Sequence, residues 1–387
     1  MNHDSARGSA LDVFHVADLL ISRALAAHGE DIDIIAYYGS HAQGVAKDTS
    51  DLDIFYIPAD GKNPPVGRTF LVEGVLFDFW PIGWDTMEGF ATGRIRGWSF
   101  APAIIHHARV LHARTEEQAA RFAALKQKVL DLQKPEARPH MVQRALDEFK
   151  KVLAHLGNLR LAAAGGDFAD VRHFGWKVIL SAWECLALAN QAFFDRGWGH
   201  LLEQTPRLKH RPEDLEALTV IVSTSDDPVQ IAGAAEKLAL GTRQVLRGCQ
   251  KSLPSQQSAR DVFDSSYPEI KDGIGKLLTA CERQQPAAAS VAAWFAQSDL
   301  SLMLNSLQHG TDYSDFNWYS EFASLYRQLG FPDLMQATRG DLPALAGQAR
   351  LLDERLRQWL REQSVDLCEF ETLGEFEHSM RRTAPDS

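Results

Sequence analysis

Strand-like patterns in this sequence are confined to residues 31–81, and helical patterns fill most of the chain beyond them. The apolar runs 31–38 and 51–57 each predict a β-strand, and 68–81 predicts two strands, or one strand bent at Gly74. A three- and four-residue apolar periodicity over 10–28 predicts a helix ahead of them. We therefore expect a small mixed α/β domain at the N-terminus.

From about Thr115 onward the periodicity is helical. The expected helices span 115–132, 139–163, 170–195, 212–222, 228–251, 268–284, 288–307, 316–329 and 342–363. Candidate linkers at 133–139 and 252–258 suggest three domains, 1–114, 115–254 and 255–387. The predicted fold class is α+β, with a small mixed-sheet domain followed by an all-helical region.

Composition excludes several classes of protein. The formal net charge of −11 disfavours a nucleic-acid partner, because it offers no basic stripe to phosphates, although it suits a cationic small substrate. The four cysteines are too widely spaced for a zinc site. There is no apolar signal core and no membrane-length apolar run, so we expect a cytoplasmic protein with no membrane partner.

The segment from Tyr38 to Tyr56, YGSHAQGVAKDTSDLDIFY, carries the clearest chemical pattern. Side chains alternate between the faces of a strand, so Asp51 and Asp53 are expected to point the same way. Two adjacent carboxylates repel each other unless a cation lies between them. Mg²⁺ prefers such oxygen ligands and completes its shell with water and phosphate oxygens.

A phosphate site is expected next to these acids. Gly39 and Ser40 lie where a strand turns into a helix, and backbone N–H groups at a helix start attract phosphates. Ser50 is expected to cap or orient the acidic strand, with nucleotide contact as the alternative. Asp78, between two phenylalanines in a later strand, needs a partner and is the candidate third acid.

Together these residues resemble the signature of the DNA polymerase β-like nucleotidyltransferase superfamily: Gly39-Ser40, Gly44, the run from Ser50 to Asp53, and Asp78. The resemblance implies that Asp51, Asp53 and Asp78 hold two Mg²⁺ ions. It also implies that Gly39 and Ser40 bind the β- and γ-phosphates of ATP or another nucleoside triphosphate. Residues 1–114 would then be the catalytic domain.

A weaker resemblance links residues 139 to about 250 with the helical half of kanamycin-type aminoglycoside nucleotidyltransferases. It rests on a helix ending Gly157 to Arg160 and on an apolar helix from Trp176 to Phe194. It implies an acceptor-binding role for 115–254 and a site built between two subunits, hence a possible homodimer. Residues 255–387 lie outside it, and their role is open.

The general base is the uncertain element of this resemblance. The family takes a Glu from the first helix of the helical half, with a Lys one turn later, but this sequence has Lys151 and His155 there. Asp78, Glu148 and Glu184 are the candidates, although Glu148 also suits a solvated helix face. We expect Glu184, in an apolar helix, to pair with Lys or Arg if it is structural.

The expected activity is Mg²⁺-dependent transfer of a nucleoside monophosphate, expected to be AMP, to a hydroxyl of a small molecule such as an aminoglycoside-like antibiotic. The alternatives are nucleotidylation of a protein or an RNA end, and a non-catalytic nucleotide-binding module. Arg94 and Arg96, which flank a glycine-rich turn, are either phosphate ligands or solvated loop charges.

Overall fold

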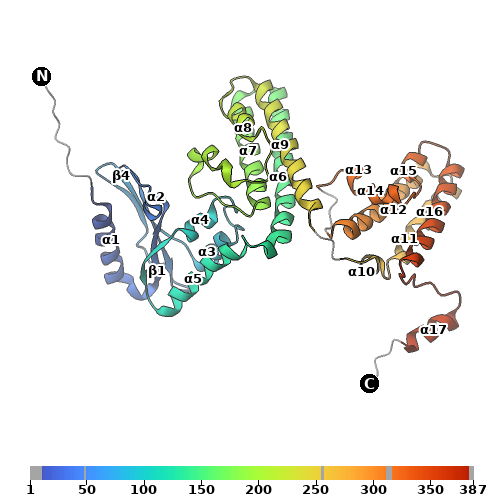
Figure 1. The fold of residues 1–387 in the computed structure, drawn as a ribbon, viewed down its shortest axis with the longest axis horizontal. Coiled ribbons are helices and arrows are strands. Elements are labelled where there is room, and N and C mark those ends of the chain that lie inside the picture. Colours follow the sequence, from blue (N-terminus) through green and yellow to red (C-terminus); the bar gives the residue numbers. More distant parts are fainter. Residues whose placement is uncertain (1–10, 48, 254–256, 311–315, 383–387) are drawn as a thin grey trace. The chain divides into compact units, whose positions relative to one another are not determined.

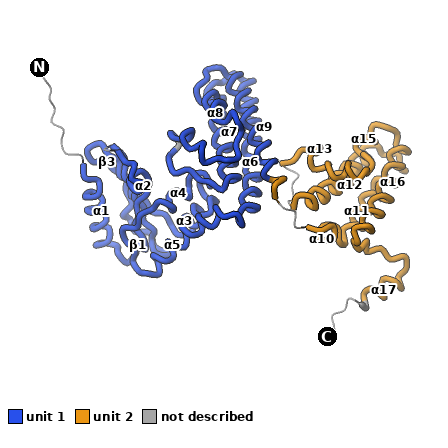
Figure 2. Tube along the Cα trace, in the orientation of Figure 1, with its two compact units in different colours: residues 1–249 blue, residues 250–387 orange. Residues whose placement is uncertain are grey.

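The computed structural model describes residues 11–47, 49–253, 257–310 and 316–382 (Figure 1). It divides into two compact units, residues 1–249 (unit 1) and 250–387 (unit 2), coloured separately in Figure 2. The predicted boundary at 254/255 lies outside the described residues, and the predicted division after residue 114 falls inside unit 1. The three-domain division therefore stays a prediction.

Unit 1 contains one five-stranded sheet with the order β3-β4-β2-β1-β5. Its strands are β1 (Ile32–Tyr38), β2 (Leu52–Pro58), β3 (Arg68–Val72), β4 (Val75–Pro81) and β5 (Arg109–Ala113). β2 pairs with β4 in parallel, and the other three pairings are antiparallel. The run 68–81 forms two strands joined at Glu73 and Gly74, and both residues have positive φ (49° and 82°). The predicted α+β class is confirmed.

Helices surround this sheet and continue beyond it. In unit 1 they are α1 (Val13–His28), α2 (Gly39–Gln43), α3 (Trp84–Ala91), α4 (Ala101–His106), α5 (Glu116–Asp131), α6 (Arg138–Gly165), α7 (Phe168–Ala189), α8 (Leu215–Thr224) and α9 (Pro228–Lys251). Short 3₁₀ turns occupy Gly29–Asp31, Pro135–Ala137, Trp198–His200 and Leu202–Arg207. The short helix α3 was not predicted, whereas α4 and β5 lie in segment 94–114, where the family resemblance implies a helix and a strand that join the two halves.

The contacts of α1 explain why the apolar periodicity of the sequence predicted this helix. The Asp12 carboxylate caps the helix by accepting hydrogen bonds from the backbone N–H groups of Phe14 and His15. Ala17, Ile21 and the other buried residues of α1 belong to one apolar cluster with Ile54 of β2 and the inner residues of β4. Burial of that face stabilises the helix against the sheet.

Two helix ends differ from the prediction. α7 was predicted over 170–195, but it ends at Ala189, because the Asn190 side chain donates to the Leu186 carbonyl and Gln191 takes a positive φ of 51°. The apolar residues up to Phe194 therefore belong to a loop. α6, predicted from periodicity over 139–163, spans Arg138–Gly165, so only the end near Arg160 that the family resemblance implied is wrong; Gly166 (φ 81°) terminates the helix.

All regular secondary structure among the described residues of unit 2 is helical. Its helices are α10 (Ala259–Phe263), α11 (Tyr267–Glu282), α12 (Pro286–His309), α13 (Tyr319–Phe322), α14 (Ser324–Gln328), α15 (Leu334–Ala337), α16 (Leu342–Glu362) and α17 (Leu373–Arg382). The predicted helix 316–329 is two short helices that meet at Ala323. Leu277, Leu300 and Leu352 bring α11, α12 and α16 together in a core of the unit's own. Within the described part of the chain, no helix is long and apolar enough to cross a bilayer.

Candidate functional site

Two of the predicted acidic residues lie side by side on the two parallel strands, Asp53 near the start of β2 and Asp78 in the middle of β4. Asp53 of β2 and Asp78 of β4 are register partners, so they occupy the same height on neighbouring strands. Asp51 precedes β2 and is exposed. The Asp78 Oδ1 atom accepts a hydrogen bond of 2.6 Å from the Thr69 hydroxyl of β3. Leu52 and Ile54, on the opposite face, are buried, in agreement with the predicted alternation.

The three carboxylates influence one another electrostatically. Burial raises the pKa of Asp53 to about 7, and the negative charges of Asp51 and Asp78 contribute to the same rise. Burial likewise raises the pKa of the Tyr38 hydroxyl, with Asp53 and Asp78 adding to the effect. A cation at this position would offset the repulsion, because it interacts favourably with all three acids.

The acids fit an open magnesium site and not a closed protein cage. Within the described ranges, no three His, Cys, Asp or Glu side chains are grouped closely enough to hold a metal ion by themselves. Mg²⁺ is commonly held by one or two carboxylates, with waters and substrate phosphates as the remaining ligands. Asp53 and Asp78, which are register partners, provide two carboxylates of this kind.

The glycine-serine corner lies directly against Asp53. Gly39 has φ +77°, and a Cβ atom added to it would lie 2.8 Å from the Asp53 Oδ2 atom, so any other residue would strain the backbone and displace the Asp53 carboxylate. The Ser40 Oγ atom is buried without a hydrogen-bond partner among the described residues, and Ser40 does not itself line the adjoining cavity. Ser50 Oγ accepts from the Lys47 N–H at 2.8 Å and so orders the turn before β2.

A cavity of about 590 Å³ opens beside this corner. It is lined by Tyr38, Gly39, Gln43, Asp53, Arg96, Phe100, Ala101, Ala103, Ile104, Phe194, Asp195, Arg196 and Gly197. The lining thus combines apolar side chains with the Asp53 carboxylate and two guanidinium groups. A volume of this size accommodates a small-molecule ligand.

Arg96 has the features of a substrate-binding residue within this cavity, whereas Arg94 does not line it. Its backbone has φ +60°, a strained value that non-glycine residues adopt rarely and often at functional sites. Its guanidinium lies 5.1 Å from the Trp80 ring centroid and 5.5 Å from that of Phe90. The aromatic rings orient the charge without neutralising it.

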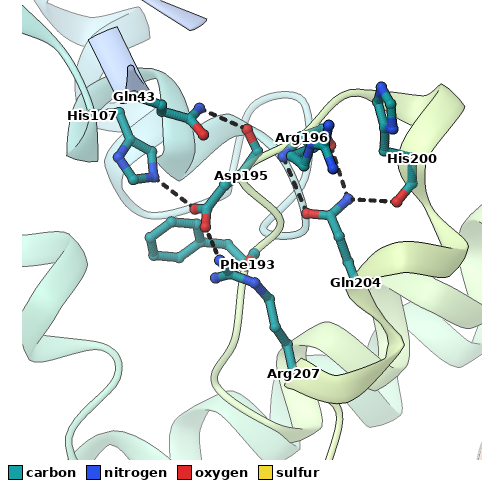
Figure 3. A network of polar contacts seen from close by, with 8 residues as sticks. All are labelled: Gln43, His107, Phe193, Asp195, Arg196, His200, Gln204 and Arg207. Carbon is teal, nitrogen blue, oxygen red and sulfur yellow. Dashed lines mark hydrogen bonds and ion pairs between the residues drawn. The ribbon is translucent and has the colours of Figure 1, made fainter. Parts of the chain in front are cut away.

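The far wall of the cavity comes from the loop after α7, and Asp195 holds this loop in place (Figure 3). The Asp195 Oδ1 atom lies 2.7 Å from His107 Nε2, at the end of α4, and its Oδ2 atom pairs with Arg207. Gln43 of α2 donates to the Asp195 carbonyl at 2.9 Å. Sequence reasoning missed this loop because it assigned the segment to α7.

Glu184 and Glu148 do not line the cavity. Glu184 is buried in α7 and accepts hydrogen bonds from the backbone N–H groups of Trp98 (2.6 Å) and Ser99 (2.8 Å). The expected Lys or Arg partner is replaced by backbone donors, so Glu184 fixes the segment that follows Arg96. Glu148 pairs with Lys151 at 2.8 Å on α6, as a helix-face carboxylate does.

Comparison with known proteins gives one family match. Residues 119–249 match the family model of the KNTase C-terminal domain, which covers the helical half of unit 1. This match supports a place for the chain among nucleotidyltransferases in general. No curated protein matches the sequence.

The solved structures include a similar nucleotidyltransferase-like protein from Exiguobacterium sibiricum. It has 13% sequence identity and a TM-score of 0.37, over 70% of this chain and 91% of that chain. A likeness this remote carries no weight for the fold or the activity.

Proposed function

We propose that unit 1 transfers a nucleoside monophosphate, most simply AMP from ATP, to a hydroxyl group of a small molecule. The proposal is carried by one observation, the register pairing of Asp53 with Asp78 on two parallel strands, beside a cavity that is lined by Asp53 and Arg96. The family match over residues 119–249 supports the same class of reaction. An aminoglycoside-like antibiotic is one acceptor class to test.

Each residue of the site has a chemical part in this proposal. Asp51, Asp53 and Asp78 would hold two Mg²⁺ ions, which when bound offset phosphate charge and favour an ionised acceptor hydroxyl. Gly39 lets the chain pass close to Asp53, and the Ser40 hydroxyl donates to a phosphate oxygen. Arg96 stabilises the negative charge that develops on the departing pyrophosphate.

Asp78 is the favoured acceptor of the hydroxyl proton. It lies level with Asp53 on the neighbouring strand, within the acidic group itself. Neither Asp78 nor Glu148 lines the cavity, but Asp78 is the register partner of Asp53, which does, whereas Glu148 forms an ion pair with Lys151 on α6. A general base must come within hydrogen-bond reach of the proton that it removes.

The test is transfer of α-labelled phosphate from ATP, with Mg²⁺, to a panel of aminoglycosides, lincosamides and sugars. We expect turnover with at least one acceptor, and Asp53→Asn should reduce it by at least about a hundredfold. Asp60→Asn is the matched control, because the Asp60 side chain is exposed and pairs only with Arg121 in the described structure. Unchanged turnover in Asp53→Asn would refute the metal assignment.

A second candidate, a nucleotide-binding module without transfer, is favoured by one feature. Lys151 stands where the resembled enzymes are expected to carry their catalytic Glu. Such a module would bind ATP yet release no pyrophosphate with any acceptor. Labelling of a partner protein or an RNA end, with no labelling of the small-molecule panel, would instead identify a macromolecular acceptor.

A further inference from the structure

Unit 2 contains an open groove that lies outside the residues matched by the family model. The groove has a volume of about 1180 Å³ and runs along the pair α11 and α12. Its floor and walls are small or apolar and include Ile270, Gly273, Ala288, Ala292, Ala296 and Met303. The lined stretch of α12, 287–303, is about 24 Å long at the α-helical rise, which suits another helix better than a small molecule.

Contacts within the described chain do not explain why residue 273 is a glycine. It lies inside α11, where glycine is less favourable than alanine, and a Cβ atom added to it would meet nothing within 4 Å. No packing inside unit 2 therefore requires the missing side chain. A bare backbone at this position lets an outside element approach α11 closely.

The same face of unit 2 exposes large apolar side chains beside the groove. Val291, Trp294 and Phe295 of α12 are 55%, 51% and 51% exposed, and the Trp294 and Phe295 rings contact each other at 4.6 Å. Aromatic side chains are enriched at the centres of protein interfaces. The exposed apolar side chains of α12 and the groove that could receive the same side chains from another molecule are thus formed by the same helix.

The charges that line the groove differ in sign on the two sides of Phe295. α11 and α12 are antiparallel because only residues 283–285 join them. Residues at equal distances from this link lie level with each other, so Lys276 of α11 lies level with about Ala292 of α12. Lys276 is therefore about one helical turn before Phe295 along α12, and Asp299 is about one turn after it. Asp272 and Glu269 of α11 also line the groove, level with about Ala296 and Asp299, so they lie on the acidic side of Phe295.

A second copy of this chain is the occupant that fits these features. Phe295 is the midpoint of the lined stretch 287–303, so a two-fold axis there exchanges the two ends of the groove. Asp299 of one copy then faces Lys276 of the other. Lys276 is available for this, since its ion pair with Asp272 joins two exposed side chains and such pairs contribute little. Asp299 and Glu269 have no ion-pair partner among the described residues.

We propose that unit 2 is a homodimerisation module in which α12 of each chain packs into the α11/α12 groove of the other, about a two-fold axis near Phe295. Each copy gives Val291, Trp294 and Phe295 to the partner's hollow. The interface stands independently of the catalytic proposal, because it uses no residue of unit 1.

Sedimentation velocity of the full-length protein over a dilution series tests the interface. We expect a concentration-dependent dimer. Phe295→Ser should raise its dissociation constant at least about a hundredfold, since the aromatic ring is lost from both copies. Gly273→Leu should also abolish the dimer by filling the groove, while the melting temperature is kept or raised, because leucine is the better helix former.

A charge exchange tests the two-fold arrangement itself. Asp299→Lys and Lys276→Glu should each weaken the dimer, whereas the double variant should restore it, because the pair is re-formed with reversed signs. Glu282→Lys on α11, outside the groove, and Leu161→Ser, an exposed apolar residue of unit 1, are the controls and should change nothing.

Three results would overturn the inference. The first is a wild-type protein that stays monomeric across the dilution series. The second is a dimer that tolerates both Phe295→Ser and Gly273→Leu, since it must then form through another surface. The third is a double charge variant as weak as the single variants, because Asp299 and Lys276 would then not face each other.

Discussion

Glu184 gives the sharpest prediction about how the fold supports the site. Its carboxylate accepts hydrogen bonds from the backbone N–H groups of Trp98 and Ser99, which follow the cavity residue Arg96 by two and three positions. Gly97 tightens the same contact: its φ is +81°, and a Cβ atom there would lie 2.9 Å from Glu184 Oε2. Replacing Glu184 therefore perturbs a connection between α7 and the loop that carries Arg96.

The magnitude for Glu184→Gln depends on the hydrogen bonds. Glutamine keeps one carbonyl oxygen, but its NH₂ group then faces the second backbone N–H, which becomes a buried donor without a partner. An unsatisfied buried donor costs about 1–3 kcal/mol. Relief from burying a charge, which raises the pKa of Glu184, offsets part of this. We expect a net loss of about 2 kcal/mol.

Thermal unfolding and amide hydrogen exchange measure this loss. A loss of about 2 kcal/mol should lower the melting temperature of unit 1 by about 4–8 °C, given its size. The Trp98 and Ser99 amides should lose protection selectively. Glu148→Gln, which removes the ion pair with Lys151 on α6 but leaves both backbone hydrogen bonds of Glu184 in place, should stay within about 0.5 kcal/mol of wild type. Wild-type stability and unchanged protection in Glu184→Gln would refute a bracing role for this carboxylate.

Three further predictions concern single positions. Gly39→Ala should abolish transfer with little effect on far-UV circular dichroism, because its Cβ atom would displace the Asp53 carboxylate; full activity would contradict the close approach. Arg96→Gln should raise the KM for ATP about tenfold or more, Arg96→Lys less, and the control Arg94→Gln not at all, as steady-state kinetics would report. Burial lowers the pKa of His112, so as the pH falls below about 6.5 the unfolded chain binds a proton at this residue before the folded chain does, and the free energy of unfolding decreases. His112→Leu should make that decrease less steep in urea unfolding measured as a function of pH. An unchanged pH dependence would contradict the prediction.

The sheet could be predicted strand by strand but not in its pairing. Alternating and apolar runs placed β1 and β2 within a residue or two, because such patterns depend on local burial. The parallel pairing of β2 with β4 is a nonlocal choice, and no local pattern encodes it. The bend at Gly74 likewise had two interpretations, and the positive φ of Glu73 and Gly74 decides for a hairpin.

The site could be predicted where residue type alone constrains the chemistry. Paired aspartates and a glycine corner have such a signature, although their catalytic roles stay predictions. Glu184 was harder, because its partners are backbone N–H groups, which every residue except proline has. Asp195 was missed because an apolar run continued past the end of α7, and its contacts with His107 and Arg207 depend on that end.

The parallel pairing of β2 and β4 has a consequence for recognising relatives of this chain. Asp53 and Asp78 are brought level by strand register, while the connection between the two strands, which includes β3, only has to return to the same edge. Insertions or deletions in residues 59–67 could therefore lengthen or shorten the gap between the two acids without separating them. A search pattern with a fixed number of residues between them would overlook such homologues, whereas an alignment that anchors each strand separately would retain them.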